Sequence, residues 1–332
     1  MIRLLCITDP LTHPSWDATV ELYRHFPEDP RFQLFHLQAE RLGDGISLLV
    51  TPVPGPLDYQ EFLALGGAPV ERARFSDFDL VFCRTDKPYL PGYLETLVRY
   101  EEAVRFLQRP SGVRDCDVRD FYRSVASRFM PVGIVTRDVA EAGNFVRTQG
   151  RVVAKRNRTY GGKGVARIWQ APGSWWIEPA SGAPEAHDAL ETILEQLFGT
   201  GPEPYEFVRY LDNVVAGDKR VVVVEGEIYG GYLRLAAAGG WINNQTAGGT
   251  VHRATVTPTE AAVVGATWRA YHDRGLDLLG YDFLLDDAGQ PTLSEINAGN
   301  VAGFGVLEVT DGAGVYARLL DWIAGLVDQG PA

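Results

Sequence analysis

The sequence has little cysteine, no long hydrophobic run and no H-x-x-x-H pair. The three cysteines, Cys6, Cys83 and Cys116, lie far apart, which argues against a disulfide framework and against a C-x-x-C metal site. No apolar segment approaches the roughly 18 residues of a transmembrane helix, and the start MIRLLCITDP resembles a first strand more than a signal peptide. We therefore expect a cytoplasmic protein with no membrane partner.

An excess of positive charge is also missing. The formal net charge is −12, from 31 Lys and Arg against 43 Asp and Glu, whereas a nucleic-acid surface needs cations to neutralise phosphates. Small-molecule partners are therefore expected and nucleic acid is not, although a local basic cleft could still bind small anions. The chain has 332 residues, 45% of them hydrophobic, which is enough for two or three domains with a large core.

The glycine-rich stretch YGGKGVARI at 160–168 fits neither of the common phosphate motifs. A Walker A loop requires Ser or Thr after the lysine, but Lys163 is followed by glycine. The dinucleotide fingerprint opens a helix, whereas an alternating apolar pattern typical of a strand follows here. The loop therefore connects two strands. It is either a plain hairpin or a flap that covers a phosphate, with Lys155 and Lys163 nearby. The G-x-S-x-G elbow of serine hydrolases is absent as well.

The first third of the chain has the pattern of an open α/β sheet. Helical patterns, among them 92–108, separate short apolar runs at 3–8, 32–37 and 79–84. Surface loops are expected at 50–60 and 170–187, because both stretches are rich in proline and glycine.

The last third is predicted to combine hairpins and helices. The runs on either side of Glu225 and Gly226 predict a hairpin over 220–237. A capping box that starts at Thr257 and a glycine at 275 predict a helix over 258–274. A final helix is expected near 313–328, with one apolar stripe.

The stretch GYDFLLDDAGQPTLSEINAGN at 280–300 is the most informative for chemistry. Two apolar runs flank a turn at 286–289 and predict a hairpin with the opposing pairs Leu285–Gln290 and Asp282–Leu293. The period of two then puts Asp282, Glu295 and Asn297 on one face, opposite a core face with Phe283, Leu285 and Ile296. Two carboxylates and an amide are hard oxygen ligands that suit magnesium. The alternative is a hairpin whose acidic residues simply face water.

Four stretches in order resemble an ATP-grasp ligase, in particular the bacterial glutathione synthetases. They are RDCDVR (114–119), AKRNRTYGGKG (154–164), YLDNVVAGDKRVVVVEGE (210–227) and TAGG…DFLL…EIN (246–297). The resemblance implies an α/β protein in which an N-terminal open α/β domain precedes a two-part α+β ATP-grasp fold with a glycine-rich lid. The expected domains are residues 1–118, a lid subdomain at 119–205 and a C-terminal catalytic subdomain at 206–332.

The resemblance also implies a role for individual residues. ATP phosphates would be bound by Arg119, Lys155 and the lid residues Gly161, Gly162, Lys163 and Gly164, while Asp218 would lie near the ribose. The interdomain hinge, whose backbone holds adenine, would comprise Val208, Arg209, Tyr210 and Leu211. Magnesium would be bound by Asp282, Glu295 and Asn297, with Arg220 on the transferring phosphoryl group. The acyl-phosphate end would be lined by Arg234, Asn244, Gly248 and Gly249, although these residues could also form an ordinary strand and turn.

Three departures from the family pattern concern the phosphate and substrate ends. Arg119 stands where the family has a second phosphate-binding lysine, and Ile242 stands where glutathione synthetases have an arginine. NAGNVAGFG replaces their N-x-T-S-P-T after the metal ligands. Arg234 or Arg253 could compensate for the missing arginine. The resemblance thus keeps the catalytic core and leaves the substrates open.

The activity implied is an ATP-dependent carboxylate–amine ligase that forms a peptide-like amide bond through an acyl phosphate. Its cofactors would be ATP and two magnesium ions, with Mn²⁺ able to substitute, and its partners a small carboxylate and a small amine, such as an amino acid or peptide. By the same resemblance a homodimer or homotetramer is expected. The alternatives are a ligase that extends a protein or peptide tail, as ribosomal-protein glutamate ligases do, and a non-catalytic ATP-binding pseudo-ligase.

Overall fold

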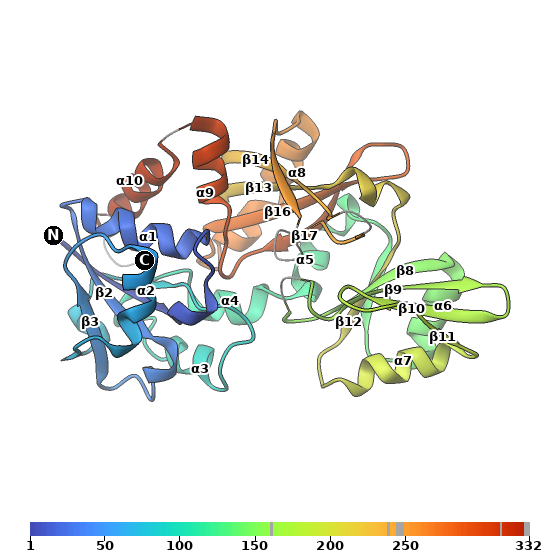
Figure 1. The fold of residues 1–332 in the computed structure, drawn as a ribbon, viewed down its shortest axis with the longest axis horizontal. Helices are drawn as coiled ribbons and strands as arrows, with labels where there is room; N and C mark the ends of the chain where they lie inside the picture. The colour runs from blue at the N-terminus through green and yellow to red at the C-terminus, as the bar shows by residue number, and fades with distance from the viewer. Residues whose placement is uncertain (160–161, 238–239, 244–248, 313, 329–332) are drawn as a thin grey trace.

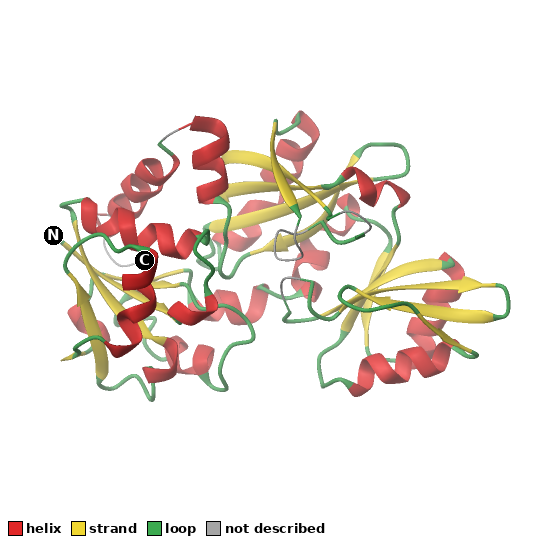
Figure 2. Ribbon diagram, in the orientation of Figure 1, coloured by secondary structure: helices red, strands yellow, loops and turns green. Residues whose placement is uncertain are grey.

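The structure is a computed structural model that describes residues 1–332 except 160–161, 238–239, 244–248, 313 and 329–332. Three sheets organise the chain (Figure 1), and Figure 2 shows helices and strands mixed along it. No helix within the described ranges is both long and apolar enough to cross a bilayer.

The N-terminal sheet has six strands in the order β4-β3-β2-β1-β5-β6. Its strands are β1 (Ile2–Thr8), β2 (Phe32–Gln38), β3 (Leu48–Val53), β4 (Glu71–Ala73), β5 (Leu80–Cys83) and β6 (Arg105–Leu107). The accompanying helices are α1 (Ala18–Glu28), α2 (Tyr59–Ala64), α3 (Tyr93–Val98) and α4 (Pro110–Cys116). Strands β2, β1, β5 and β6 run parallel, as the predicted open α/β sheet requires.

Two local predictions in this region are wrong. The helix predicted over 92–108 ends at Val98, and 105–107 instead pairs with β5 as strand β6, which buries Phe106 and Leu107. Sheet pairing overrides the local helical pattern there. The loop predicted at 50–60 is shorter, because β3 continues to Val53 and α2 begins at Tyr59.

The three cysteines are free thiols and belong to the apolar core. Cys6 and Cys116 are buried, and Cys83 is partly buried.

The second sheet, with the order β11-β10-β9-β8-β12-β7, lies with its helices at one end of the molecule (Figure 1). Its strands are β7 (Gly133–Thr136), β8 (Arg151–Arg156), β9 (Val165–Ala171), β10 (Ser174–Pro179), β11 (Glu185–His187) and β12 (Tyr205–Arg209). Its helices are α6 (Val139–Gln149) and α7 (Leu190–Gly199), which pack on it through an apolar cluster. Strands β8 and β9 are antiparallel, so the glycine-rich stretch connects two strands as predicted.

The predicted loop at 170–187 is wrong, because β10 and β11 lie within it. Trp175 and Ile177 alternate with Trp176, and the first two are buried in the cluster beneath the sheet. That alternation outweighs the surrounding proline and glycine. The predicted boundary after residue 205 also cuts into β12, which pairs with β7 and β8. We propose that the boundary lies after Arg209 instead.

The third sheet is antiparallel throughout, in the order β15-β14-β13-β16-β17. Its strands are β13 (Asp218–Val224), β14 (Glu227–Leu235), β15 (Thr250–Ala254), β16 (Leu278–Leu285) and β17 (Pro291–Asn297). The helices beside it are α5 (Arg119–Ala126), α8 (Pro258–His272), α9 (Phe304–Leu307) and α10 (Val315–Asp328). The hairpin predicted over 220–237 and both predicted helices are confirmed. Thr257 and Glu260 form the expected capping box.

The N-terminal and third sheets share apolar clusters and are tied together by a buried amide. Gln108 accepts hydrogen bonds from the backbone N–H groups of Asp277 and Leu278, at 2.7 and 3.0 Å. It donates to the carbonyl of Ala298 at 2.8 Å. A buried amide with its donors and acceptors satisfied fixes the position of both partners. This contact holds the chain that leaves β17 against the N-terminal sheet.

Candidate active site

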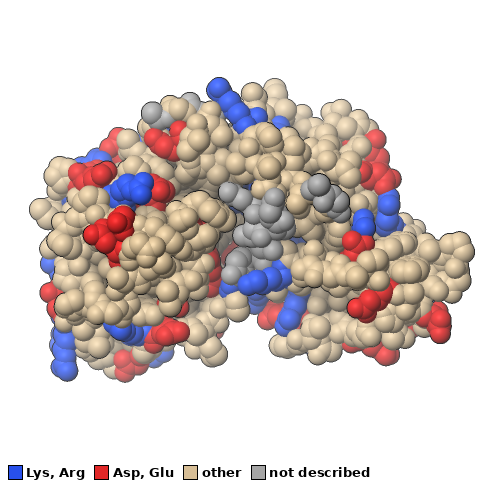
Figure 3. All heavy atoms as spheres, viewed as in Figure 1, with Lys and Arg blue, Asp and Glu red and all other residues tan. Residues whose placement is uncertain are grey.

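A cavity of about 430 Å³ contains most of the predicted site residues. Its walls come from β8, the hinge after β12, the β13–β14 and β16–β17 hairpins, and the loop after β1. Figure 3 shows a hollow between the end of the molecule that carries the second sheet and the rest, with Lys and Arg side chains beside it. The volume lies within the roughly 300–1,000 Å³ of small-molecule sites.

The β16–β17 hairpin brings two carboxylates and an amide to this cavity, but in a register that differs from the predicted one. Phe283 opposes Leu293, and Asp282 opposes Glu295, so Ser294 is an extra residue. The predicted Asp282–Leu293 and Leu285–Gln290 pairs are therefore wrong. A bulge turns the following residues relative to the partner strand. It aligns Glu295 and Asn297 with Asp282 in the cavity wall.

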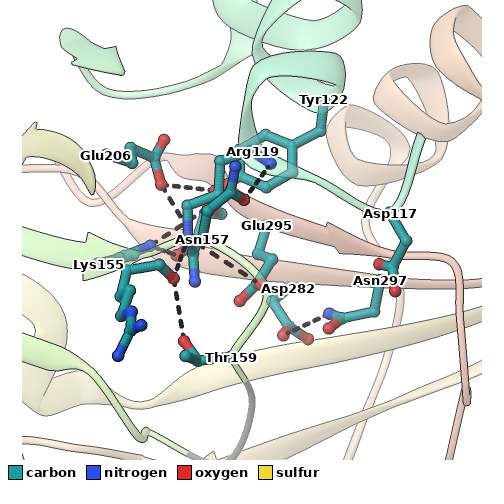
Figure 4. Close-up of polar contacts among 12 residues, drawn as sticks. Asp117, Arg119, Tyr122, Lys155, Asn157, Thr159, Glu206, Asp282, Glu295 and Asn297 are labelled. Carbon is teal, nitrogen blue, oxygen red and sulfur yellow. Dashed lines mark hydrogen bonds and ion pairs between the residues drawn. The ribbon is translucent and has the colours of Figure 1, made fainter. Parts of the chain in front are cut away.

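The shared face itself holds in the structure. The Asn297 Nδ2 group donates to Asp282 Oδ2 at 3.2 Å, and Figure 4 shows Glu295 beside them. On the opposite side Phe283 and Ile296 are buried in the core, as predicted, whereas Leu285 is only partly buried near the turn.

Strands β13 and β14 place two arginines against Asp282. Arg220 forms a bidentate pair with this carboxylate through its Nε and Nη2 atoms, and Arg234 Nη2 lies 2.9 Å from Asp282 Oδ1. Burial alone would raise the pKa of Asp282, but the two guanidinium groups outweigh it and lower the pKa to about 2. The pKa shift therefore favours an ionised Asp282 carboxylate.

Asp218 lies on the same face and behaves differently. Arg234 Nη2 donates to its Oδ2 at 2.7 Å, while Oδ1 is buried with no hydrogen-bond partner among the described residues. Burial raises the pKa of Asp218 to about 6 despite this arginine. Arg234 Nε is likewise unpartnered in the described part. Unpaired buried polar atoms that line a cavity indicate a place where a polar ligand binds.

Arg119 is held by a carboxylate that the sequence analysis missed. Glu206, on β12, is fully buried, and its carboxylate lies 3.3 Å from Arg119 Nη1 (Figure 4). The same carboxylate accepts hydrogen bonds from the Tyr122 hydroxyl at 2.5 Å and from Arg123 Nη1 at 2.7 Å. Burial opposes its charge, but Lys155 and Arg119 keep the pKa of Glu206 below its usual value. No local pattern predicts the burial of Glu206, because a single Glu in a strand usually faces solvent.

Two cations point from this network toward the metal-ligand candidates. Arg119 Nη1 lies 3.7 Å from Glu295 Oε1, and Lys155 Nζ lies 3.1 Å from Ser294 Oγ. Figure 4 shows Arg119, from the start of α5, and Lys155, from β8, near Glu295. The wall thus combines anionic oxygens with positive charge, which is the composition that a metal–phosphate complex needs.

Fourteen of the predicted site residues line the cavity. They are Arg119, Lys155, Gly162, Lys163, Val208, Arg209, Tyr210, Leu211, Asp218, Arg220, Arg234, Asp282, Glu295 and Asn297. Gly164 and Gly249 are not among the lining residues. Gly161, Asn244 and Gly248 lie outside the described residues. Residues that the sequence analysis missed include Ser294, Trp241 and a group from the N-terminal sheet, namely Thr12, Trp16, Asp17 and Asp86.

The donor set fits magnesium. Asp282 and Glu295 offer carboxylate oxygens and Asn297 an amide oxygen, which are hard ligands that leave positions for water and phosphate. Gly164 allows the end of the β8–β9 connection to lie close against Arg156. Its φ is 71°, and a Cβ there would meet Arg156 Cβ at 2.8 Å.

The chain is similar to glutathione synthetases in sequence. The family model of the prokaryotic glutathione synthetase ATP-grasp domain matches residues 121–311. The glutathione synthetase of Parasynechococcus marenigrum is 29% identical over 314 residues, which cover 91% of this chain and 92% of that protein. The glutathione synthetase of Brucella melitensis is 28% identical over 258 residues, 77% of this chain and 76% of that one.

Solved structures show the same fold at low sequence identity. A D-cycloserine synthetase aligns with a TM-score of 0.63 at 15% identity and covers 98% of this chain and 99% of its own. A RiPP-associated ATP-grasp ligase of Chryseobacterium gregarium, in complex with ADP and a leader and core peptide, has a TM-score of 0.62 at 15% identity over 100% of this chain and 98% of its own. The predicted resemblance and the ATP-grasp fold are both confirmed.

Proposed function

Because this chain belongs to the prokaryotic glutathione synthetase ATP-grasp family, we propose that it joins a small carboxylate to an amine through an acyl phosphate formed in the cavity. That it is an ATP-dependent, ADP-forming carbon–nitrogen ligase follows from the family and its relatives. One observation carries the finer proposal. Two acidic residues and an amide on β16–β17 share one cavity with cations that include Arg119 on α5, Lys155 on β8 and Arg220 on β13.

In the proposed reaction the terminal phosphoryl group of ATP moves to a substrate carboxylate oxygen. The bond between this phosphorus and the β-phosphate oxygen breaks, an acyl phosphate forms and ADP leaves. An amine then attacks the acyl carbon, the new C–N bond replaces the C–O bond to phosphate, and the amine proton passes to phosphate or solvent. No protein nucleophile is required.

Different residues of the cavity wall would bind the nucleotide, the metal and the transferring phosphoryl group. Lys155, Arg119 and the β8–β9 glycines would bind the phosphates, and the 208–211 segment would bind adenine. Magnesium held by Asp282, Glu295 and Asn297 would supply Lewis-acid stabilisation of phosphate charge. Arg220 would orient and stabilise the transferring group, because a guanidinium matches phosphoryl oxygens with paired donors. The number of metal ions, two by resemblance, stays a prediction.

The rival functions differ in a measurable way. A ligase for a peptide or protein tail would ignore free amino acids, and a pseudo-ligase would bind ATP without turnover. The retained cavity and its carboxylates favour turnover. ADP release measured against a panel of free acids and amines, and against peptides, tests the proposal directly. We expect ADP release to require both a free acid and an amine. Release that occurs only with peptide tails would favour the alternative ligase, and ATP binding with no release would favour the pseudo-ligase.

The β8–β9 connection is expected to close over bound nucleotide. The backbone N–H groups around Gly162 would bind phosphate and shield Arg158 and Lys163 from trypsin. Saturating ATP and magnesium should therefore slow cleavage within 156–165 about 10-fold, as a gel time course would show. Cleavage after Arg41, outside the cavity, is the control and should be unchanged. Equal cleavage rates within 156–165 with and without ATP would contradict a lid.

γ-Glutamylcysteine with glycine is expected to be a poor substrate pair. Ile242 lines the cavity where glutathione synthetases have an arginine, and Arg234 is already paired with Asp218 and Asp282. An unpaired carboxylate in a desolvated pocket costs a few kcal/mol. We expect glutathione formation to be at least about 100-fold below the rate with the preferred pair, measured by chromatography. Glutathione formed at about 1–100 per second would show that the chain is an ordinary glutathione synthetase.

A further inference from the structure

One wall of the cavity comes from the N-terminal sheet and carries negative charge. Asp17 and Asp86 line it together with Thr12, Pro14 and Trp16, and Asn300 and Ala302 continue it from the chain after β17. None of these described wall residues is Lys or Arg, whereas the opposite wall holds Lys155, Arg220 and Arg234. The cavity is therefore polarised, with phosphate-binding cations on one side and two carboxylates on the other.

A fully buried histidine stands behind the two carboxylates, and its tautomer can be assigned. Thr8 Oγ1 donates its only proton to the carbonyl of Arg84 at 2.9 Å. His13 Nε2, 2.6 Å from the same Oγ1, must therefore be the donor in that contact. In the neutral ring this leaves a lone pair on Nδ1. Nδ1 has no hydrogen-bond partner among the described residues and lies 3.3 Å from Asp17 Oδ1 and 3.8 Å from Asp86 Oδ2.

The remaining neighbours do not supply the missing donor. Asn300 Nδ2 donates to Asp86 Oδ1 at 2.6 Å, but its own Oδ1 is a further unpartnered acceptor in the described part. Arg84 directs Nε to Thr19 Oγ1 and Nη1 to the carbonyl of Val301. Its buried Nη2 has no hydrogen-bond partner among the described residues, and no described ion pair joins Arg84 to either carboxylate. With a neutral His13 ring, the unpartnered His13 Nδ1 and Asn300 Oδ1 and the two carboxylates together offer more acceptors than this one free donor can satisfy. A bound group with several N–H donors and a positive charge would balance them.

We propose that Asp17 and Asp86 bind the protonated amino group of the acid whose carboxylate is phosphorylated, so that the acyl donor is an amino-bearing acid. An ammonium group supplies three donors and one positive charge. It has no lone pair with which to attack an acyl phosphate, so the group bound here is a non-reacting one. The inference rests on the proposed function.

The position of the subsite suits the acid. Asn300 is three residues beyond Asn297, one of the proposed magnesium ligands, so the subsite begins where the phosphoryl-transfer site ends. The bound acid would then place its carboxylate at Arg220 and its ammonium at Asp86, which line the same cavity. Trp16, half exposed in the same wall, offers an aromatic face beside that ammonium.

Hydroxylamine provides a test that does not require the natural amine, because it traps an acyl phosphate as a hydroxamate. The intact protein with ATP and magnesium would be given free L-amino acids and dipeptides, each beside its N-acetyl derivative. We expect the productive free acid to exceed its N-acetyl form at least about 100-fold in kcat/KM. Asp17→Asn and Asp86→Asn should each raise the KM of that acid about 10- to 100-fold, leave the KM of ATP unchanged and narrow the preference over the N-acetyl form.

The controls separate binding from folding. Asp17 caps α1 by accepting from the Thr19 N–H group, a role that Asn also fills, so melting temperatures should change little. Asp188→Asn makes the same change at an exposed residue outside the cavity lining and should leave every constant unchanged. If a variant fails to fold, the comparison of free and N-acetyl acids in the unaltered protein still tests whether an ammonium group is bound.

Two failures are distinguishable. Hydroxamate formed equally from free and N-acetyl acids, or unchanged KM values in both variants, would overturn the ammonium subsite while leaving the ligase proposal standing. No hydroxamate and no ADP from any acid, with or without an amino group, would contradict the proposed function itself.

Discussion

Glu295→Gln should lower ADP release at limiting magnesium at least about 100-fold, because one of the two proposed anionic metal ligands is lost while Lewis-acid stabilisation of phosphate charge is worth several kcal/mol. The fold should be unaffected. The Glu295 side chain is 30% exposed, and its described ion pair is a 3.7 Å contact with Arg119, which also has Glu206. The measurement is ADP release across a magnesium titration, with the melting temperature recorded alongside.

If Glu295→Gln acts by weakening metal binding, its ADP release should depend on the magnesium concentration. Part of the lost activity should return as magnesium is raised, because mass action offsets a weaker site. Glu195→Gln makes the same change on the exposed side of α7 and should behave as the unaltered protein. Undiminished turnover of Glu295→Gln at limiting magnesium would contradict the assignment of Glu295 as a metal ligand.

Arg220→Met should lower kcat about 10³-fold with a much smaller change in ATP affinity. An arginine that stabilises a transferring phosphoryl group contributes about 10³–10⁵ in kcat. Its loss should be felt mainly in the transition state, because Lys155 and Arg119 remain to bind ground-state phosphates. Single-turnover rates and the Kd of ATP, measured by titration calorimetry, separate the two effects.

Two further variants guard this interpretation. Arg220→Lys keeps the positive charge but loses the paired N–H donors of the guanidinium, so its kcat should lie between those of Arg220→Met and the unaltered protein. Arg147→Lys, in an exposed pair between Arg147 on α6 and Glu191 on α7, should have no effect. A large rise in the Kd of ATP with unchanged kcat would assign Arg220 to ground-state binding instead. Arg220 also balances Asp282, so a loss of melting temperature in Arg220→Met, absent from Arg220→Lys, would indicate a structural contribution.

Much of the site could be predicted because its residues follow strand periodicity. Asp282, Glu295 and Asn297 share a face in the sequence pattern and in the structure. The register could not be predicted, since the extra residue Ser294 has no glycine or other local signal of a bulge. The predicted shared face was nevertheless correct. Leu293, which was predicted opposite Asp282, and Glu295, which is found there, are two positions apart, and residues two apart in a strand lie on the same face.

Other features depend on contacts that no local pattern shows. Glu206 is buried only because β12 lies between β7 and β8, so that Arg119 and Arg123 converge on it. Asp17 and Asp86 reach the cavity because the N-terminal sheet packs against the third sheet through residues such as Gln108. Residues 105–107 became a strand by pairing with β5, against the helical pattern around them. Tertiary context decides in each of these cases.

If the reaction passes through an acyl phosphate, one oxygen of the substrate carboxylate must leave with the phosphate, and isotope labelling can follow that oxygen. The preferred acid, labelled with ¹⁸O in its carboxyl group, would be converted with ATP, magnesium and amine, and the released phosphate analysed by mass spectrometry. The account predicts one ¹⁸O atom in inorganic phosphate for each amide formed, because the oxygen that accepts the phosphoryl group leaves with it. Unlabelled phosphate, or ¹⁸O found in AMP, would contradict it.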